Sequence, residues 1–256
     1  MRRSLPPEPV STAAVWSRRL GLFALTLAIL AVALARAHKL DPPAALASIG
    51  GAIVVALAAV LLFVTACATI WRSGAQGFGR ALGGLFFAAL TLGYPAFLAV
   101  EAMRYPVLAD VSTDVDDPPD FSRSRAALQA RGGYTPPTPP AATRAAQAAA
   151  YPDVHPIVVD LDMDEALAAV MKTAATRGWR LVDKRPPNAR SGDAHVDFLV
   201  KTRVMGFDED ATVRLRPLAG QTRIDLRAAS RHGRHDFGEN ASRIEDFAEE
   251  LQAQVE

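Results

Sequence analysis

Residues 44–71 read AALASIGGAIVVALAAVLLFVTACATIW and contain no charged side chain. A helix that crosses the hydrocarbon core of a bilayer needs about 20 mostly apolar residues, so this run is long enough to span a membrane with some tilt. A buried helix of a soluble protein is the alternative, but the rest of the chain is too small to cover several such helices. We therefore predict an integral membrane protein.

Two further apolar runs lie on either side of this stretch. Residues 20–35 form one, which lengthens towards the N-terminus if Arg18 and Arg19 reach the interface. Residues 81–100 form the other, and neighbouring helices would tolerate its Gly93 and Pro95. We predict a membrane region over residues 1–104 with about three transmembrane helices, at 16–35, 46–70 and 81–101.

The first run has two alternative interpretations. Basic residues before it and Ala-Leu-Ala at 33–35 are also typical of a signal peptide. Ser17-Arg18-Arg19 is weakly similar to a twin-arginine signal, from which Gly21 and Leu22 depart. Lys and Arg favour the cytoplasmic side, so either interpretation starts the chain in the cytoplasm. We expect a multi-pass protein of the bacterial inner (plasma) membrane whose C-terminal domain is periplasmic.

The spans carry no ionisable residue in their interiors, whereas ion and proton pathways usually require such groups. We therefore predict an anchor rather than a transporter. Small residues would let the helices pack closely against each other or against another protein. The expected partners are the lipid bilayer and either a membrane protein or further copies of the chain. The glycines concerned are Gly50, Gly51, Gly79, Gly83 and Gly84.

Residues 105–150 form a connecting segment that is first acidic and then rich in Pro and Ala. The carboxylates of DVSTDVDDPPD (110–120) could hold Ca²⁺, but the glycine and terminal glutamate of an EF-hand are missing, so a solvated or docked strap is favoured. Residues 134–140 predict a polyproline stretch, and 141–150 a short helix. We interpret the segment as a spacer between the bilayer and a soluble domain at 151–256.

The soluble domain has 15 Lys and Arg against 19 Asp and Glu, which argues against nucleic acid as a partner. Its pattern begins with a strand at 157–161 and a helix whose Asp162 and Glu165 form a capping-box pair. The strands that follow alternate. Their predicted inward residues are Val196, Phe198, Val200, Thr202, Val204, Val213, Leu215, Ile224, Leu226 and Ala228.

A final helix is expected to start near Asp236 and to bury Ile244, Phe247, Leu251 and Val255. The element order β-α-β-β-β-β-α predicts an α+β fold, a two-layer sandwich of an antiparallel sheet with two helices on one face. Clean alternation predicts that the other face is solvated. Its cations, Lys201, Arg203, Arg214, Arg216, Arg223 and Arg227, could instead lie against anionic head groups.

Four motifs resemble the bacterial domain of unknown function 1499 family: DVSTDVDDPPDF (110–121), YPDVHPI (151–157), RLRP (214–217) and RIDLRAASRHGRHDFGENASRIEDF (223–247). The resemblance covers roughly residues 105–252. Members of that family often carry N-terminal spans, and the family has no established activity. The resemblance therefore implies architecture and location but transfers no catalytic residue.

The densest polar cluster lies where the last strand should meet the last helix. Helix N-termini favour anions, and arginine side chains can bind a phosphate or carboxylate in bidentate fashion. An anionic-ligand site is thus one interpretation, and a structural cap with solvated arginines is the other. The candidate ligand-binding residues are Arg231, His232, Arg234, His235, Asp236 and Asn240.

Metal and nucleophile chemistry have weaker support at this cluster. His232, His235 and Asp236 could hold a metal with His155 or His195, but their spacing falls on a turn. A triad of Ser230, His232 and Asp236 would come from one short segment, unlike known triads. The single cysteine, Cys67, excludes an intrachain disulfide and a cysteine zinc cage. We predict no catalytic residue, metal or cofactor.

The sequence thus favours a membrane-anchored, non-enzymatic binding or interaction module of the bacterial envelope. An enzyme or ligand-binding protein that acts on an anionic envelope substrate through residues 231–236 is the alternative. A subunit of a larger membrane complex is a third possibility.

Overall fold

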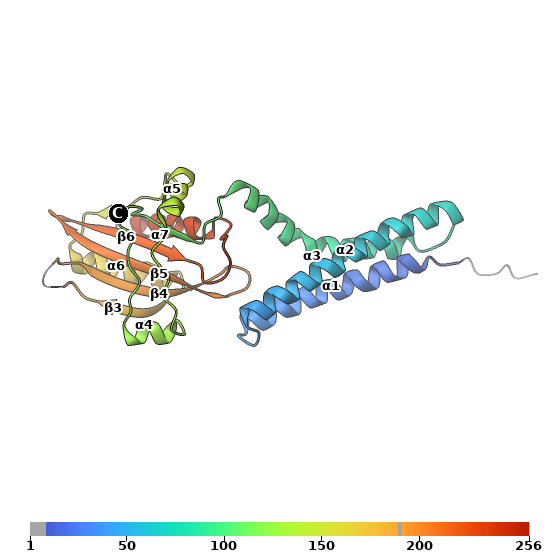
Figure 1. Cartoon of the computed structure of the whole chain (residues 1–256), viewed down its shortest axis with the longest axis horizontal. Coiled ribbons are helices and arrows are strands. Elements are labelled where there is room, and N and C mark those ends of the chain that lie inside the picture. Colours follow the sequence, from blue (N-terminus) through green and yellow to red (C-terminus); the bar gives the residue numbers. More distant parts are fainter. Residues whose placement is uncertain (1–8, 189–190, 256) are drawn as a thin grey trace, which may run out of the picture. The chain divides into compact units, whose positions relative to one another are not determined.

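The structure is a computed structural model that describes residues 9–188 and 191–255. The chain divides into a helical unit and a second unit that begins at Glu101 (Figure 1). Each unit has its own core, and the two are described separately below.

Three long helices make up the helical unit: α1 (Thr12–Arg36), α2 (Pro42–Ser73) and α3 (Phe78–Arg104). The Ser11 side chain accepts a hydrogen bond from the Ala14 amide and caps α1. Gly74 ends α2 in the left-handed conformation, with φ of 67°. All three helices are long and apolar enough to cross a membrane. Each extends a few residues beyond the predicted span.

Small side chains fill the interior of this unit, and large apolar side chains lie on its outside. Ala24, Ala56, Ala59 and Ala88 form one buried cluster, whereas outward residues such as Leu61 are 68% exposed. A soluble protein would bury the large side chains. Close packing through small residues with leucine and phenylalanine outside is typical of helices that are surrounded by lipid.

The closest glycine contacts of this unit lie between α1 and α3. A Cβ placed on Gly84 would come within 2.2 Å of the Ser17 Oγ, and one on Gly21 within 2.5 Å of the Gly84 carbonyl oxygen. The Ser17 hydroxyl also donates to the Ala59 carbonyl of α2, at 2.9 Å. Ser17 therefore joins all three helices. Three of the other glycines that the sequence offered for packing, Gly50, Gly51 and Gly79, have no neighbour within 4 Å of such a Cβ.

We expect Gly84→Ala to loosen the helical unit, because its methyl group would collide with the α1 backbone and force the helices apart. Overpacking of this kind costs about 1–3 kcal/mol. Gly93→Ala is the matched control in the same helix, since its Cβ would meet nothing within 4 Å. Thermal unfolding in detergent is the measurement, and equal melting temperatures for both variants would contradict the contact.

The second unit has ten elements. They are β1 (Asp110–Ser112), α4 (Arg125–Ala130), α5 (Ala141–Ala150), β2 (Ile157–Val159), α6 (Met163–Thr176), β3 (Arg180–Arg185), β4 (Ala194–Lys201), β5 (Asp208–Leu218), β6 (Gln221–Ala229) and α7 (Glu239–Val255). The sheet is antiparallel, in the order β1-β6-β5-β4-β3, and β2 also pairs with β6. β1 and β2 occupy successive stretches of the same edge of β6.

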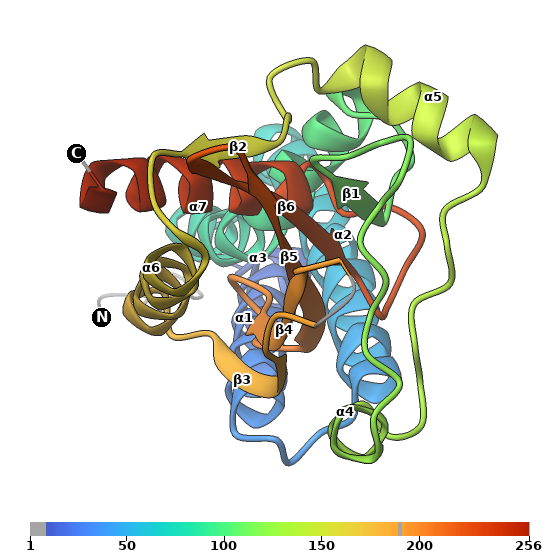
Figure 2. The same cartoon turned by 90° about the vertical axis from the view of Figure 1, so that its left-hand side faces the viewer.

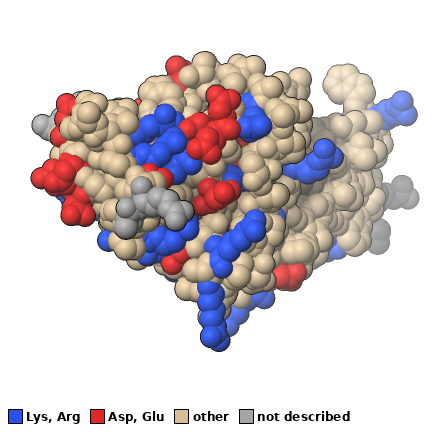
Figure 3. Space-filling model, turned by 60° about the vertical axis from the view of Figure 1, so that its left-hand side comes forward, with Lys and Arg blue, Asp and Glu red and all other residues tan. Residues whose placement is uncertain are grey.

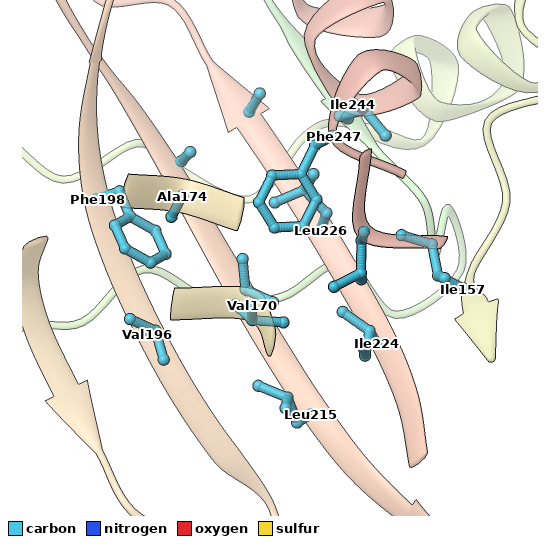
Figure 4. Close-up of a cluster of buried hydrophobic side chains, with 14 of the residues drawn as sticks. Ile157, Val170, Ala174, Val196, Phe198, Leu215, Ile224, Leu226, Ile244 and Phe247 are labelled. Carbon is cyan, nitrogen blue, oxygen red and sulfur yellow. The ribbon is translucent and has the colours of Figure 1, made fainter. Parts of the chain in front are cut away.

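One face of this sheet carries α6 and α7 over the apolar core, as the sequence predicts (Figure 4). Val170 and Ala174 of α6 and Phe247 of α7 face the strand residues (Figure 4). The predicted inward residues are buried except Thr202, Val204 and Val255, because β4 ends at Lys201, before the first two, and Val255 is the last residue of α7. The Asp162–Glu165 capping box is formed. The predicted α+β fold, with two helices on one face of an antiparallel sheet, is therefore confirmed.

The helix α7 begins at Glu239, three residues later than predicted. Phe237 and Gly238 have φ values of 54° and 80°, so the backbone cannot yet be helical there. Asp236 still caps the helix from outside, because its carboxylate accepts hydrogen bonds from the amides of Gly238 and Asn240, each at 3.0 Å.

The other face of the sheet is covered, which corrects the prediction that it is solvated. Residues 110–140, here called the strap, contribute β1, run across β5 and β4 to α4, and return (Figures 1 and 2). Asp197 and Arg227, both expected on the solvated face, are 1% and 0% exposed. The segment interpreted as a spacer is thus largely part of the folded domain, and only residues 105–109 separate α3 from β1.

The outer edge of β1 is closed by a side chain rather than by another strand. The Gln147 amide of α5 accepts a hydrogen bond from the Ser112 amide at 3.0 Å and donates to the Ser112 carbonyl at 2.6 Å. It thereby makes both bonds that a neighbouring strand would make, and the edge offers no free pair of groups to another chain at that residue.

Candidate functional site

The interface between the strap and the sheet contains the densest set of charges in the described residues. Arginines lie on β5 and β6 and aspartates on β4, β5 and β6, and the strap supplies groups of opposite charge. Cationic and anionic side chains consequently lie side by side on the surface that Figure 3 draws. The ion pairs across this interface join Arg131 to Asp197 and Asp210, Arg214 to Asp114 and Asp117, Arg216 to Asp114 and Asp117, Arg223 to Asp114, and Arg227 to Asp110.

Three arginines converge on one strap carboxylate at the β5–β6 end of this interface. Nη2 atoms of Arg214, Arg216 and Arg223 lie 3.4, 2.7 and 2.6 Å from the Asp114 Oδ2. We call Arg214, Arg216 and Arg223 the three-arginine cluster. Asp225, on β6, also contacts all three and is completely buried.

Strand register brings the three-arginine cluster together. Arg216 of β5 lies directly opposite Arg223 of β6, and Arg214 lies opposite Asp225. Like charges that face each other across strands destabilise a sheet. The pair of Arg216 and Arg223 therefore needs counter-charges. Asp225 of β6 provides one, and Asp114 provides a second from a segment about a hundred residues earlier in the chain.

The pKa of Asp114 is lower than the usual value of an aspartate. Its partial burial acts in the opposite direction, because burial disfavours the charged form. The Asp117 amide and the nearby charges of Arg216 and Arg223 outweigh that effect. Asp114 is therefore held as a carboxylate, the form that the three-arginine cluster requires.

Phe121 of the strap lies between two buried guanidinium groups. The Cζ atoms of Arg131 and Arg227 are 5.1 and 4.9 Å from the centre of its ring. Arg131 pairs with Asp197 at 2.6 Å and with Asp210 at 2.8 Å. Cation–π contacts are strongest when they are desolvated, so Phe121 holds the centre of the strap to the sheet.

Arg227 is the largest fully buried side chain in the described residues. It donates to Asp110 at 2.9 and 2.7 Å and to the backbone carbonyls of Pro119 and Pro137 at 3.0 and 2.6 Å. One guanidinium thus joins the beginning, the middle and the end of the strap. Proline-rich backbone accepts these bonds readily, since its carbonyls have no helical or sheet partner.

The predicted ligand-binding residues fall into two groups. Arg231, Asp236 and Asn240 are engaged within the domain: Arg231 makes two bonds of 2.8 Å to Asp210, and Asp236 caps α7. The Asn240 amide donates to the Ala109 carbonyl and to the Ser230 hydroxyl, at 3.3 and 3.0 Å. These contacts hold residue 109, just before β1, against the start of α7.

The other three residues of the predicted site lie nearer the surface. His232 and Arg234 are exposed. The pKa of His232 is nevertheless lowered, first by the partial burial of its ring and then by the positive charge of Arg231. The His235 Nδ1 accepts from the Phe237 amide at 2.9 Å, and its ring stacks on the Phe237 ring. Whether these six residues bind an anionic ligand stays a prediction.

Sequence reasoning missed the three-arginine cluster as a site because it treated the cations as an outward stripe. The signal was present in the match between that stripe and the acidic run at 110–120. Among residues 9–188 and 191–255, no group of three or more His, Cys, Asp and Glu side chains is arranged to hold a metal ion.

Two hollows lie beside α7. One, of about 380 Å³, runs between α7 and the chain before β2, and its exposed rim carries Asp153, Glu245 and Glu249. The other, of about 350 Å³, lies between the end of α6 and α7. Its arginines, Arg177 and Arg243 among them, are paired with carboxylates of α7 and β5.

Comparison with family models matches residues 110–251 to the family described as "Protein of unknown function (DUF1499)". The match covers more than half of the sequence. The chain belongs to this family. The resemblance that the motifs predict is thereby confirmed. No curated protein and no solved structure matches the chain significantly.

The limits of the family match agree with the fold of the second unit. The match begins at Asp110, the first residue of β1, and ends at Leu251 in α7. The DUF1499 unit therefore includes the strap together with the sheet and both covering helices, whereas the three apolar helices lie outside it.

We expect Arg131→Met to destabilise the DUF1499 domain by about 3–5 kcal/mol, because Asp197 and Asp210 stay buried without their shared partner. Arg177→Met is the control, since its ion pairs are partly exposed and should contribute about 0–1 kcal/mol. Urea unfolding of the full-length protein in detergent can be followed by Trp179, which stacks on Phe247. Phenylalanine would replace Trp16 and Trp71 in all variants.

The lowered pKa of Asp114 predicts an acid-sensitive strap. A group whose pKa is lower in the folded state stabilises that state above its unfolded pKa of about 3.9 and loses the effect as the pH falls through the folded value. The free energy of unfolding should therefore fall below about pH 4, and it should fall less steeply in Asp114→Asn.

The comparison with Asp114→Asn at each pH is needed because buried Asp110 and Glu209 have raised pKa values, caused first by burial. These two groups oppose the trend, since protonation favours their folded state. Parallel pH profiles for the wild type and Asp114→Asn would contradict the assignment to Asp114.

Proposed function

We propose that this DUF1499 protein is a membrane-anchored, non-enzymatic binding or interaction module of the bacterial envelope. The proposal rests mainly on the polar cluster at the β6–α7 junction, where three of the six side chains make structural contacts within the domain. Arg231, Asp236 and Asn240 hold a carboxylate, a helix end and residue 109, respectively. The side chains that would be the first candidates for catalysis thus stabilise the fold of the domain.

The helical unit supports the anchoring part of this proposal. Its surface consists of large apolar side chains, and its interior of alanine, glycine and serine. The residues buried within the three helices include no Lys, Arg or His, and the basic residues lie near the helix ends. An anchor needs only a lipid-compatible surface and a stable helix bundle, and the described helices provide both.

The distribution of basic residues supports a periplasmic DUF1499 domain. Arg2, Arg3, Arg18 and Arg19 precede or begin the first span, and Arg72 and Arg80 flank the connection between the second and third. The opposite side has Arg36, Lys39 and Arg104. Basic residues favour the cytoplasmic side, so the first group is assigned to the cytoplasm and the domain to the periplasm.

An enzyme that acts on an anionic envelope substrate through residues 231–236 remains the alternative function. Such an enzyme would have to release Arg231 from Asp210, or use Arg234 and His232 alone. Replacement of His232 and Arg234 by alanine tests this directly, because both side chains are exposed and their loss should leave the fold intact. A cellular phenotype with an unchanged fold would favour the alternative.

Cysteine labelling in intact cells tests the orientation. In a Cys67→Ala background, a membrane-impermeant maleimide should label Ala253→Cys on α7 and Lys39→Cys between α1 and α2, both at exposed positions. Ser73→Cys, at the exposed end of α2, should react only after the membrane is permeabilised. The reverse pattern would place the domain in the cytoplasm.

Native mass spectrometry of the full-length protein tests the binding role. The protein released from membranes should carry a bound lipid, small molecule or protein partner at a defined stoichiometry. A bare, folded monomer in every preparation would contradict a binding module, and it would leave the orientation result unaffected.

A further inference from the structure

The three-arginine cluster brings three positive charges together, and the sheet supplies one counter-charge there, the buried Asp225. Arg216 and Arg223 face each other directly across β5 and β6, and their guanidinium groups meet at a single oxygen atom of Asp114. Convergence of several arginines on one oxyanion is typical of sites that recognise phosphate groups.

The site also remains reachable from solution. The side chains of Arg216 and Arg223 are 27% and 30% exposed, and that of Asp117 is 67% exposed. By contrast, Arg131 and Arg227, at the centre of the strap, are fully enclosed. The Asp114 end of the strap is therefore the part that a soluble group can approach without opening the whole interface.

The cluster has donor capacity that the strap does not use. The Arg216 Nε is buried and has no hydrogen-bond partner among the described residues. A carboxylate presents two oxygen atoms, whereas a phosphate group presents three or four, and arginine binds both in bidentate fashion. A phosphate group could consequently satisfy more of these donors than Asp114 does.

We infer that the three-arginine cluster is a binding site for a phosphate group, in which Asp114 of the strap occupies the position of the ligand. The phosphate comes either from a lipid head group or from a free phosphate. Binding displaces Asp114 and frees residues 114–117 from the sheet, while Arg131, Phe121 and Arg227 keep the rest of the strap in place. This inference deepens the proposed binding role and rests on it.

The variant Asp114→Asn tests whether the Asp114 carboxylate competes with phosphate for the three-arginine cluster. It keeps the shape of the side chain but removes the charge that competes for the arginines. Asp116→Asn is the matched control, because it removes the same charge two residues further along the chain. The Asp116 side chain is exposed, and no ion pair is found for it among the described residues. Arg180→Gln is the corresponding control for loss of an arginine, since Arg180 lies exposed on β3.

Inorganic phosphate is the first probe, titrated into the full-length protein in a maltoside detergent, which contains no phosphate. Isothermal titration calorimetry should show that Asp114→Asn binds phosphate at least about tenfold more tightly than the wild type or Asp116→Asn, the factor expected when one charge-assisted hydrogen bond no longer competes. Arg216→Gln and Arg223→Gln in the Asp114→Asn background should abolish binding, and Arg180→Gln should not.

Hydrogen exchange of the wild-type strap provides a second readout that does not depend on the stability of any variant. Phosphate should speed amide exchange in residues 114–117, relative to sodium chloride at the same ionic strength, because the Asp117 amide loses its bond to Asp114. Exchange in residues 121–131 should stay unchanged. Unchanged exchange at 114–117 would overturn the inference, as would equal phosphate affinity of Asp114→Asn and Asp116→Asn.

The same exchange experiment, repeated with lipid, distinguishes a lipid head group from a free phosphate as the source of the phosphate. Mixed micelles with phosphatidylglycerol are compared with micelles that contain diacylglycerol, which has the same acyl chains but no phosphate. Faster exchange with phosphatidylglycerol identifies a lipid head group, whereas an effect of inorganic phosphate alone identifies a free phosphate. Failure of both arms would not affect the cysteine-labelling result, so the site and the anchoring role can fail separately.

Discussion

The DUF1499 domain depends on the ion pairs between the strap and the face of the sheet opposite α6 and α7. Neither side could be buried alone, since an unpaired arginine or aspartate in the interior is costly. Aspartates of the strap meet arginines of β5 and β6, and an arginine of the strap meets aspartates of β4 and β5. The pairing runs in both directions, which fixes the register of the strap along the sheet.

This arrangement gives the two faces of the sheet different physical characters. The face under α6 and α7 is held by apolar burial, which tolerates substitutions of similar volume. The face under the strap is held by directional hydrogen bonds, which do not tolerate such substitutions. The domain therefore combines an ordinary hydrophobic core with a charged interface that specifies one position of a segment with few apolar residues of its own.

The sequence predicted the elements that depend on periodicity. Alternation in β4, β5 and β6, helical spacing in α6 and the capping pair of Asp162 and Glu165 all reflect local rules, and the structure agrees with them. The three apolar helices are equally evident, since length and hydropathy suffice to recognise them. The start of α7 was misplaced because the left-handed Phe237 is not apparent from its residue type.

The covered face could not be predicted in the same way. A strand that alternates apolar and charged residues looks identical whether water or a complementary segment lies on the charged side. Only a pairwise comparison of distant segments, Asp114 with Arg216 and Arg223 for example, would have shown the match. The same limitation applies to Gly84, whose contact with Ser17 depends on how α1 and α3 cross and not on its neighbours in the sequence.

The position of the strap in the chain has a consequence for biogenesis. The ribosome completes β1 and the acidic run more than a hundred residues before β6. Contacts between such distant segments form late and slow the folding of a domain. β1 pairs with β6 alone among the strands, so this end of the strap must remain unpaired while β3, β4 and β5 are made, and the domain cannot fold progressively from its N-terminal end. An incomplete chain that ends before β6 would lack Asp225 and Arg227, so the arginines of β5 and Asp110 of the strap would each lose a partner of opposite charge.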